Sequence, residues 1–477
     1  MSSIRLSPRE QFDISLYRKF LNELQNRAGQ LWETTLCRPP TSNTIDLLAE
    51  HMMIRESLFE IEMMQKTFSG SSETDSTCSE RRKAALADFM RWADMVGISH
   101  HLVKIVYQED MDGFGLISSN YARLGSELLK VPRKAIFSFD QARKSSYLNM
   151  LTAFIFQYLR PSPLFEESLL LYRNVSRQFI HFLLEIIRSD EFRHRKKKSK
   201  EEMPKLEPIY VYSPFTAINF TFNLYRWSVA CISTRINLIP SKVLKDAAGR
   251  PRMVPALIPF LDMANHSYTK STVLEAVHFS DEFDCAKIVA IRDYEASESV
   301  TIFYGQRSNR DFLLHNGFVP LEKNDRDTYK LKIGLPKSKR EDARMNLFHD
   351  LGFVAESTVF AFEISVCATY THHVLFDFAK IYVLDEIPAA AEQVEEALNS
   401  ADNIRKAWHF LHDRFALLLR AYGKAIDPTE VIHPEPPEFT RSCDTVRKFM
   451  IDRLKLSEIE ILLKVKDFCS KQLLETA

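Results

Sequence analysis

The stretch ALIPFLDMANHS, residues 256–267, is an apolar, strand-like run that ends in Asn265-His266-Ser267. A second apolar run, SVTIFYGQRSNRDFLLHNGFV at residues 299–319, places Tyr304 immediately before Gly305. Taken singly, neither pattern is diagnostic. An Asn-His pair after an apolar segment is usually a turn, and a tyrosine at a strand end is usually a buried phenol with a hydrogen-bond partner. The rest of the chain decides between these interpretations and a functional site.

Outward from these stretches, the spacing of apolar residues divides the chain into three parts. Residues 1–80 contain helical patterns at 7–32 and 43–68, followed by a polar linker, SGSSETDSTCS, at 69–79. Residues 81–320 mix strand and helix patterns, which predicts an α+β region with a helical insert. The strand patterns lie at residues 101–107, 115–118, 273–279, 285–291 and 299–303, and the helical patterns at 81–95, 147–159, 166–187 and 215–236. Residues 321–477 are helical in pattern, above all at 389–421 and 444–474, which predicts an all-helical lobe.

The composition limits the class of protein. Hydrophobic residues make up 45% of the 477 residues, enough for a large core. Lys and Arg number 63, as do Asp and Glu, so the basic surplus of a typical nucleic-acid-binding protein is missing. The seven cysteines are widely spaced and include no C-x-x-C pair. This spacing disfavours a disulfide framework and a zinc site, and it indicates a reducing, intracellular compartment.

The apolar stretches are shorter than the roughly 18 residues that a membrane span needs, and residues 1–15 lack the apolar core of a signal peptide. We therefore expect a soluble, cytoplasmic monomer with no nucleic-acid or membrane partner. The basic run RHRKKKSK at residues 193–200 leaves a nuclear-localisation signal open. A solvated loop after a helix is the simpler interpretation, because acidic residues and a proline follow at once.

Further motifs stand upstream of the two stretches. Residues 112–116 read DGFGL and residues 131–133 read VPR; the helical insert, DMxNHS and FYGxRSN follow in that order. A lone GFGL would be weak support for any family, but four motifs in order are specific. The order resembles that of the SET-domain protein methyltransferases, from about residue 89 to the C-terminus. Within them it is most similar to the group of the Rubisco large-subunit lysine methyltransferase and the actin-histidine methyltransferases, and TRINLIP at residues 234–240 is most like the latter branch.

The resemblance implies a SET domain at residues 81–320, with small β-sheets, a helical insert and a knot-like core. It also implies a helical, Rubisco-methyltransferase-type substrate-binding domain at residues 321–477. S-adenosyl-L-methionine is the implied cofactor, and no metal is implied. The cofactor-binding residues carried over by motif are Gly113, Phe114, Gly115, Arg235, Asp262, Asn265, His266 and Tyr304. The implied catalytic residues are Tyr304 and Asn237, and the implied substrate-binding residues are Asn237, Leu261 and Arg307.

A histidine is a chemically reasonable acceptor for the methyl group. A lysine amine must lose a proton at pH 7, at a cost of roughly 4–5 kcal/mol, whereas a histidine with a pKa of about 6.5 is mostly neutral. The neutral ring needs only the tautomer that leaves the attacking nitrogen unprotonated. Asn237, where the actin-histidine branch also has Asn, could select that tautomer by contacting the other ring nitrogen. A bulky aromatic residue there would favour a lysine chain instead.

The sequence therefore leaves three functions open. The first is a protein-histidine N-methyltransferase that acts on actin with S-adenosyl-L-methionine. The second is a protein-lysine methyltransferase whose substrate is a histone or another protein. The third is an inactive SET-domain adaptor that binds actin. The retained Asn265, His266 and Tyr304 favour an enzyme. Leu261, where the branch has Trp, Ser126 before the VPR motif and a shortened insert favour the adaptor.

Overall fold

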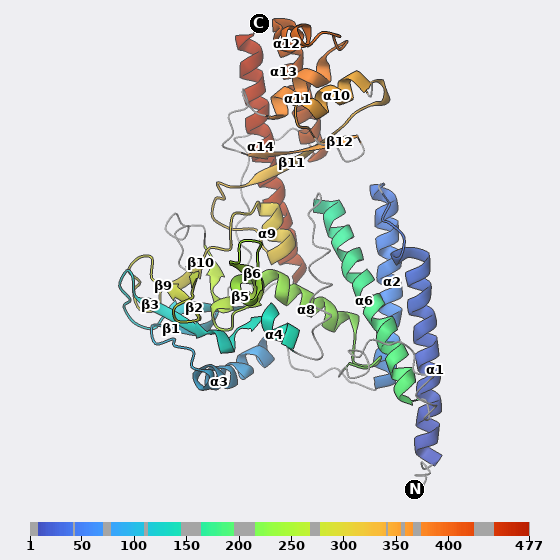
Figure 1. The fold of residues 1–477 in the computed structure, drawn as a ribbon, viewed down its shortest axis with the longest axis vertical. Coiled ribbons are helices and arrows are strands. Elements are labelled where there is room, and N and C mark those ends of the chain that lie inside the picture. Colours follow the sequence, from blue (N-terminus) through green and yellow to red (C-terminus); the bar gives the residue numbers. More distant parts are fainter. Residues whose placement is uncertain are drawn as a thin grey trace. The chain divides into compact units, whose positions relative to one another are not determined.

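The structure, a computed structural model, describes residues 8–41, 43–69, 78–108, 113–144, 164–194, 215–267, 277–339, 342–353, 358–365, 374–423 and 443–476. These residues form two compact units, one within residues 8–302 and one within residues 303–476. The first unit holds an N-terminal helical block and the small sheets, and the second holds the C-terminal lobe (Figure 1). In the described part of the chain, no helix combines the length and the apolar character that crossing a membrane requires.

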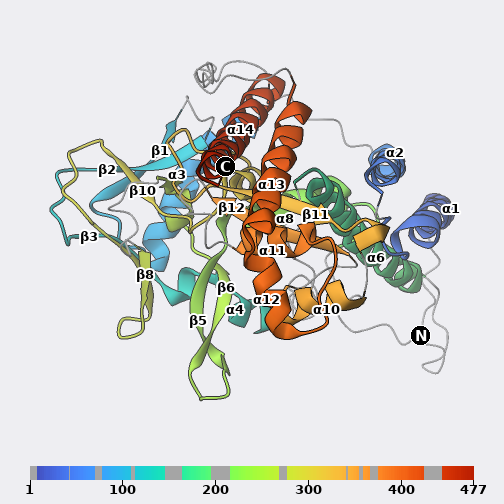
Figure 2. The same cartoon turned by 90° about the horizontal axis from the view of Figure 1, so that it is seen from above.

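The helical block consists of long helices that lie side by side. They are α1 (Pro8–Leu31), α2 (Thr44–Ser69) and α6 (Leu164–His194), with α8 (Phe222–Arg235) packed against α6 (Figures 1 and 2). A π-helix, η1 (Trp32–Leu36), follows α1. Apolar residues of α1 recur at three- and four-residue spacing, so one face of the helix is apolar and buried. The helices predicted at 7–32, 43–68 and 166–187 are confirmed.

A buried ion pair joins helices α6 and α2 of this block. The Arg173 Nε on α6 donates to Glu50 Oε1 on α2 at 2.7 Å, and the two side chains are only 3% and 15% exposed. The Arg173 Nη2 also donates to the carbonyl oxygens of Thr35 at 2.9 Å and Arg38 at 2.6 Å. The Thr35 carbonyl lies in the last turn of η1, where a helix leaves acceptors without intrahelical partners, and Arg38 follows two residues after η1 ends. One guanidinium thus stabilises the connection between α1 and α2.

Three small sheets form the rest of the first unit as described, with strand orders β1-β2-β10-β7, β3-β9-β8 and β4-β6-β5. Their strands are β1 (Val103–Gln108), β2 (Gly113–Ser118), β3 (Glu127–Pro132), β4 (Phe137–Ser138), β5 (Asn237–Lys245), β6 (Pro251–Leu257), β7 (Asn265–His266), β8 (Val277–Ser280), β9 (Cys285–Val289) and β10 (Ser299–Ile302). The helical elements among them are α3 (Cys78–Val96), α4 (Phe139–Lys144) and the 3-10 turns η3 (Arg133–Ala135) and η5 (Leu261–Met263). The strands predicted near β1, β2, β9 and β10, and the helix at 81–95, are confirmed.

Two predicted elements of this unit differ from the structure. The helix predicted at 215–236 begins only at Phe222, because Thr221 caps it and its Oγ1 accepts from the backbone N–H of Leu224 at 3.3 Å. The strand-like run 256–267 is not one strand: β6 ends at Leu257, and Phe260 has a φ of 72°, which extended backbone does not allow. The helix predicted at 147–159 lies outside the described residues, as do 70–77 of the predicted linker, 195–200 of the basic run and 273–276 of one predicted strand.

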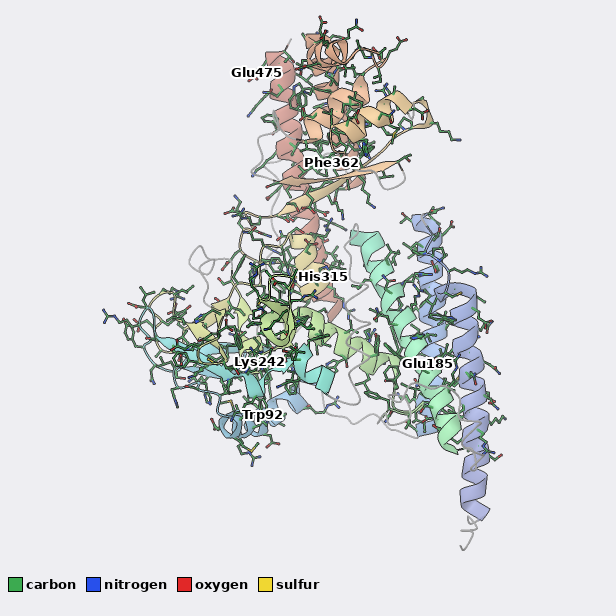
Figure 3. The ribbon with its side chains drawn as sticks, in the orientation of Figure 1. Trp92, Glu185, Lys242, His315, Phe362 and Glu475 are labelled. Atoms are coloured by element: carbon green, nitrogen blue, oxygen red, sulfur yellow. The ribbon has the colours of Figure 1, made fainter. Side chains whose placement is uncertain are left out.

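The second unit is mainly helical, as predicted. Its helices are α9 (Asn309–Asn316), α10 (Asp342–Asp350), α11 (Val374–Val383), α12 (Ala391–Asn399), α13 (Ala401–Ala421) and α14 (Cys443–Glu475), with a 3-10 turn η7 (Lys337–Lys339). The prediction of an all-helical lobe is wrong in one respect, because β11 (Thr328–Gly334) and β12 (Val359–Ser365) form an antiparallel pair. Alternate residues of β12 are buried, the period-two pattern of a strand. The rings of Phe360 and Phe362 each pack 4.9 Å from that of Phe378 on α11 (Phe362 is labelled in Figure 3).

Candidate cofactor and substrate site

Motifs that are far apart in the sequence meet in one sheet. Strand β2, which carries residues 113–115, pairs antiparallel with β10. Strand β10 pairs in parallel with β7, so that Ile302 lies opposite His266. Tyr304 follows β10 by two residues along the chain. The glycine motif, the Asn-His pair and the strand that leads to the tyrosine are therefore neighbours, as the motif order implied.

Gly115 lies beneath a pair of amide side chains. The Asn265 Nδ2 donates to Gln108 Oε1 at 2.8 Å and also lies 3.4 Å from the carbonyl oxygen of Phe114. A Cβ atom added at Gly115 would stand 2.5 Å from Gln108 Oε1 and 2.9 Å from Asn265 Nδ2. Only glycine accommodates this approach without displacing the amides. Gln108, the last residue of β1, was not predicted as part of the site, and no local sequence signal marks it.

The aromatic residue of the glycine motif is held by the preceding strand and by α3. The Phe114 ring meets the edge of the Tyr107 ring at 5.3 Å, with an interplanar angle of 85°. The guanidinium of Arg82 lies 5.4 Å from the Phe114 ring, and the ammonium of Lys83 lies 3.9 Å from the Tyr107 ring. Both distances are within the range of cation–π attraction. Helix α3 therefore brings two positive charges to strands β1 and β2 of this sheet.

A polar cluster links the end of α8, the start of β5 and the turn η5. The Arg235 Nη1 donates to the carbonyl oxygen of Asp262 at 2.7 Å. The Asn237 Nδ2 donates to Asp262 Oδ1 at 3.0 Å and to the carbonyl oxygen of Arg235 at 3.1 Å. The other carboxylate oxygen, Asp262 Oδ2, accepts from the backbone N–H of Ile258 at 2.7 Å. Because η5 packs against β2, the cluster lies beside the glycine motif.

The contacts of the Asp262 side chain are with the chain itself, and its predicted contact with the cofactor stays a prediction. Both carboxylate oxygens accept hydrogen bonds from the chain itself, so the group holds Asn237 and closes the η5 turn. Burial raises the pKa of Asp262 to about 7, although the Ile258 N–H, the charge of Arg235 and the Asn237 amide each oppose the shift. The protonation state of Asp262 therefore changes near neutral pH, and with it the hydrogen bond to Asn237.

The residues before Asp262 form a tight, buried turn. Phe260 combines a φ of 72° with a ψ of −53°, the values of a rare γ-turn conformation that is strained for a residue with a side chain. Its ring stacks on His100 at 4.8 Å and is fully buried. Leu261 is also fully buried, with 0% of its surface exposed. As the structure stands, Leu261 packs into the interior, and its predicted contact with a substrate stays a prediction.

Tyr304 and Arg307 belong to the second unit. The Tyr304 ring packs edge-on against Phe318 at 6.4 Å, just before Gly305, whose φ of 99° turns the chain. The Arg307 side chain donates to Asn316 Oδ1 on α9, and burial lowers the pKa of its guanidinium. Burial also lowers the pKa of His315 on α9 (Figure 3), with a further contribution from Arg307. This segment is thus ordered by α9, while the other predicted site residues stand in the first unit.

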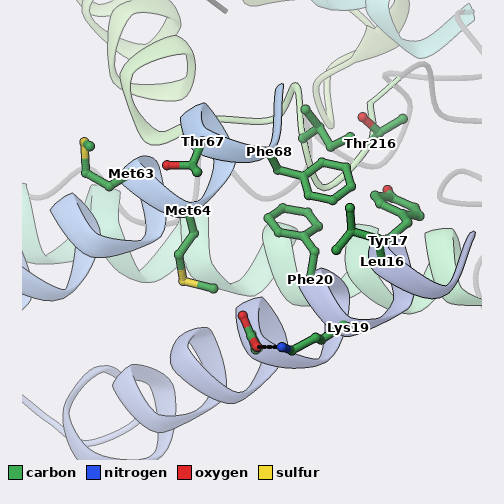
Figure 4. A pocket seen from close by; sticks show the side chains of 11 residues that line it. Leu16, Tyr17, Lys19, Phe20, Met63, Met64, Thr67, Phe68 and Thr216 are labelled. Atoms are coloured by element: carbon green, nitrogen blue, oxygen red, sulfur yellow. Dashed lines mark ion pairs between the residues drawn. The ribbon is translucent and has the colours of Figure 1, made fainter. Parts of the chain in front are cut away.

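A cavity of about 1070 Å³ lies elsewhere, between α1, α2 and the segment before α8 (Figure 4). Its lining is largely apolar and includes the stacked rings of Phe20 and Phe68, whose centroids are 4.4 Å apart. None of the motif residues lines this cavity, so it is not the cofactor site. Within the described ranges, His, Cys, Asp and Glu side chains form no group of three or more that could hold a metal ion.

Comparisons with known proteins agree with this geometry. No family model matches the chain. An actin-histidine N-methyltransferase of Homo sapiens is 27% identical over 492 residues, covering 93% of this chain and 76% of the relative. One of Mus musculus is 26% identical over 506 residues, with the same coverage. A structure of Rubisco LSMT bound to AdoMet aligns with a TM-score of 0.53 at 16% identity, covering 82% of this chain and 93% of that chain.

The chain has the fold of the SET-domain methyltransferases and is similar in sequence, at 26–27% identity, to actin-histidine N-methyltransferases. A second structure, the SET domain of LSMT bound to lysine and AdoHcy, has the same TM-score of 0.53 at 15% identity, covering 82% of this chain and 92% of that chain. This fold explains why a parallel pair, β7 with β10, stands in a sheet that is otherwise antiparallel. The Asn-His segment and the strand before Tyr304 pair although they are 36 positions apart in the sequence, which is the central pairing of the expected knot-like core.

Proposed function

We propose that this SET-domain methyltransferase transfers a methyl group from S-adenosyl-L-methionine to a histidine of actin. The choice of acceptor rests on relatives of 26–27% identity named actin-histidine N-methyltransferase. It also rests on one contact in the chain, the hydrogen bond from Asn237 Nδ2 to Asp262 Oδ1 at 3.0 Å. A cytoplasmic location follows from the proposal, because monomeric actin is a cytoplasmic protein.

S-adenosyl-L-methionine is the cofactor, and the described residues fit it. Arg235 is exposed and is anchored through one N–H to the carbonyl oxygen of Asp262. A guanidinium has five N–H donors, so the anchored group can still bind a carboxylate at its other edge. The neighbouring β7 would supply Asn265 and His266 to the amino end and the adenine. When bound, the cofactor supplies a sulfonium methyl group that a neutral nitrogen lone pair can take as the carbon–sulfur bond breaks.

The role of Asn237 follows from the orientation of its amide. Its NH2 group faces two acceptors, Asp262 Oδ1 and the carbonyl oxygen of Arg235. The amide oxygen is then the atom that Asn237 can offer to a substrate, and an oxygen accepts only from a protonated ring nitrogen. A histidine bound in this way has its proton on the nitrogen beside Asn237. The other nitrogen keeps its lone pair and is the one that can attack.

No general base is required for this acceptor. A neutral imidazole already carries the lone pair, and the methylated ring can release its remaining N–H proton to water near neutral pH. The residues of the chain therefore act by alignment, by choice of tautomer and by exclusion of water. Tyr304 is assigned to the transfer channel by motif alone, and Arg307 to the substrate. A lysine ammonium could also donate to the Asn237 oxygen, which keeps a lysine acceptor as the alternative.

The decisive experiment is incubation of the purified full chain with monomeric actin and isotopically labelled S-adenosyl-L-methionine, followed by mass-spectrometric mapping of the label. Label on one actin histidine is expected. Label on a lysine would refute the histidine acceptor and support the alternative, a protein-lysine methyltransferase. If actin takes no label and calorimetry detects no binding of S-adenosyl-L-methionine, the protein is an adaptor and the proposal fails.

Matched variants test the site assignment. Tyr304→Phe and Asn265→Ala should each reduce turnover more than tenfold while circular dichroism stays unchanged. The control for the tyrosine is Tyr121→Phe, because Tyr121 is 54% exposed and belongs to none of the motifs. Arg235→Ala should weaken binding of S-adenosyl-L-methionine in calorimetry, whereas Arg250→Ala in the turn between β5 and β6 should not. Full activity in Tyr304→Phe and Asn265→Ala would refute the assignment.

A further inference from the structure

Helix α2 has an apolar face on each of two sides. One side carries the buried residues Leu47, Ile54, Leu58 and Ile61, which pack toward α1 and α6. The other side carries a second row of large apolar side chains that are exposed. They are Ile45 (78% exposed), Leu48 (41%), Met52 (55%), Phe59 (62%) and Met63 (44%), together called the α2 stripe. A helix with apolar residues on both sides is typical of one that is covered on both sides.

The α2 stripe is continuous along the helix. At 100° per residue, its members and the two charged residues between them, Arg55 and Glu56, fall within an arc of about 100°. The spacing of three and four residues is that of a helix–helix seam. At one end the stripe borders the cavity of Figure 4, since Met63 also lines that cavity. An exposed apolar row of this extent marks an interaction surface more often than chance exposure.

From Leu48 to Met63, the order of residues in the stripe is self-complementary. When the helix is laid antiparallel on a copy of itself, with the twofold axis between Arg55 and Glu56, Leu48 faces Met63 of the copy and Met52 faces Phe59. At the centre, Arg55 of each copy faces Glu56 of the other copy, so the pair of helices has two such contacts. A twofold interface requires this reciprocity: if residue i of one copy contacts residue j of the other, then residue j of the first copy contacts residue i of the second. We propose that two copies of this chain associate through the α2 stripes in this antiparallel register.

The charges select this arrangement over a parallel one. In a parallel pair in register, Arg55 would face Arg55 and Glu56 would face Glu56, so like charges would meet at the centre of an apolar seam. In the antiparallel pair the same four groups form two opposite-charge contacts. Charge complementarity of this kind fixes register and orientation more than it adds affinity. The apolar pairs on either side provide the association, and the methionines adapt to the partner's shape.

The proposal replaces the monomer expected from the sequence. A single pair of helices buries less surface than the roughly 1,600 Å² of a standard stable interface, so a weak dimer is expected. The full chain should therefore shift from 55.4 kDa toward twice that mass as its concentration rises through the micromolar range. Sedimentation equilibrium measures this shift directly. A chain that stays monomeric up to 200 µM would overturn the proposal.

One pair of variants tests the surface. Phe59→Glu places a charge opposite Met52 of the copy and should weaken the dimer more than tenfold. Met53→Glu is the matched control, because Met53 is 47% exposed on the same helix but lies off the arc of the stripe. Both residues are exposed, so both variants should fold, which circular dichroism checks. Equal loss of the dimer in the two variants would contradict this surface.

A charge swap tests the register. Arg55→Glu alone sets Glu against Glu56 of the partner, and Glu56→Arg alone sets Arg against Arg55. Each single variant should weaken the dimer, and the double variant should restore it because opposite charges again face each other. Residues 55 and 56 are adjacent on one helix and do not face each other, so the rescue cannot arise within one chain. A double variant as weak as the singles would refute the antiparallel register. None of these variants touches the methyl-transfer site, so the outcome is independent of the proposed function.

Discussion

Replacing Asp262 by asparagine keeps the shape of the side chain but exchanges an acceptor oxygen for an NH2 donor. If the new amide oxygen keeps the bond from the Ile258 N–H, now 2.7 Å, its NH2 group faces the NH2 of Asn237. Turning Asn237 over removes that repulsion but sets its oxygen against the carbonyl oxygen of Arg235, to which its NH2 now donates at 3.1 Å. Neither orientation satisfies all the groups. The variant therefore removes the fixed direction of the Asn237 oxygen on which the proposed choice of tautomer depends.

The size of the effect follows from the bond that is lost. At pH 8, where Asp262 with its pKa of about 7 is mostly ionised, a hydrogen bond to the charged group contributes about 1.5–3 kcal/mol, and each 1.36 kcal/mol corresponds to a factor of about ten in rate. Turnover on actin in Asp262→Asn should therefore fall about 10- to 150-fold. Binding of S-adenosyl-L-methionine should change less than about threefold, because Arg235 is anchored by the backbone carbonyl of Asp262 and not by its side chain.

Single-turnover transfer of labelled methyl groups to actin gives the rate, and calorimetry gives the affinity for S-adenosyl-L-methionine. Asp293→Asn is the matched control: Asp293 also accepts from a backbone N–H, that of Leu124 at 2.7 Å, and from the Tyr121 hydroxyl at 3.0 Å. The control should keep wild-type turnover. Turnover of Asp262→Asn within twofold of wild type would refute the orienting role. A loss confined to cofactor affinity would instead return Asp262 to the cofactor site implied by the motif.

Three further outcomes follow from contacts in the first unit. Because the pKa of Asp262 is raised from 3.8 to about 7 in the folded chain, the folded chain retains a proton that the unfolded chain releases. The free energy of unfolding of the wild type, relative to Asp262→Asn, should thus decrease by about 2–4 kcal/mol between pH 4 and 8 in urea titrations; a difference that does not vary with pH would contradict this. Gly115→Ala should destabilise the chain by about 1–3 kcal/mol, and adding Gln108→Ala should recover part of the loss; equal stability of Gly115→Ala and wild type would show that the amide pair moves freely. Arg173→Met should cost about 3–5 kcal/mol of unfolding free energy by leaving Glu50 buried without its partner, whereas Arg188→Met, at a side chain 55% exposed, should change it by less than about 0.5 kcal/mol.

Most helices could be predicted from the sequence because their signal is local. A helix that is buried along one face shows that face as a spacing of three and four residues, and this spacing is present in α1, α2 and α6. The missed strands have weak local signals. Strand β5 and strand β6 contain Pro240 and Pro255, which interrupt the pattern of an ordinary strand, and β12 is a seven-residue alternation among helices.

In the candidate site, too, some features could be predicted from the sequence and others could not. The motif order in the sequence was enough to bring Gly115, Asn265 and the strand before Tyr304 into one expected site, and the pairing of β2, β10 and β7 agrees with it. The contacts that set the orientation of the side chains could not be predicted. Gln108 reaches Asn265 across 157 positions of sequence, and no motif includes it.

Sequence alone thus determined the family resemblance, the helical periodicity and the residue types available for methyl transfer. Tertiary structure decided which partner each polar group has. Asp262 accepts a hydrogen bond from Asn237, 25 positions away in the sequence, and the side-chain amides of Gln108 and Asn265 pack against Gly115. It also decided that the second apolar face of α2 is exposed. The physical reason is that periodicity and motifs record local backbone preferences, whereas a hydrogen bond, a desolvated carboxylate or an uncovered face depends on which distant residues the fold brings into contact.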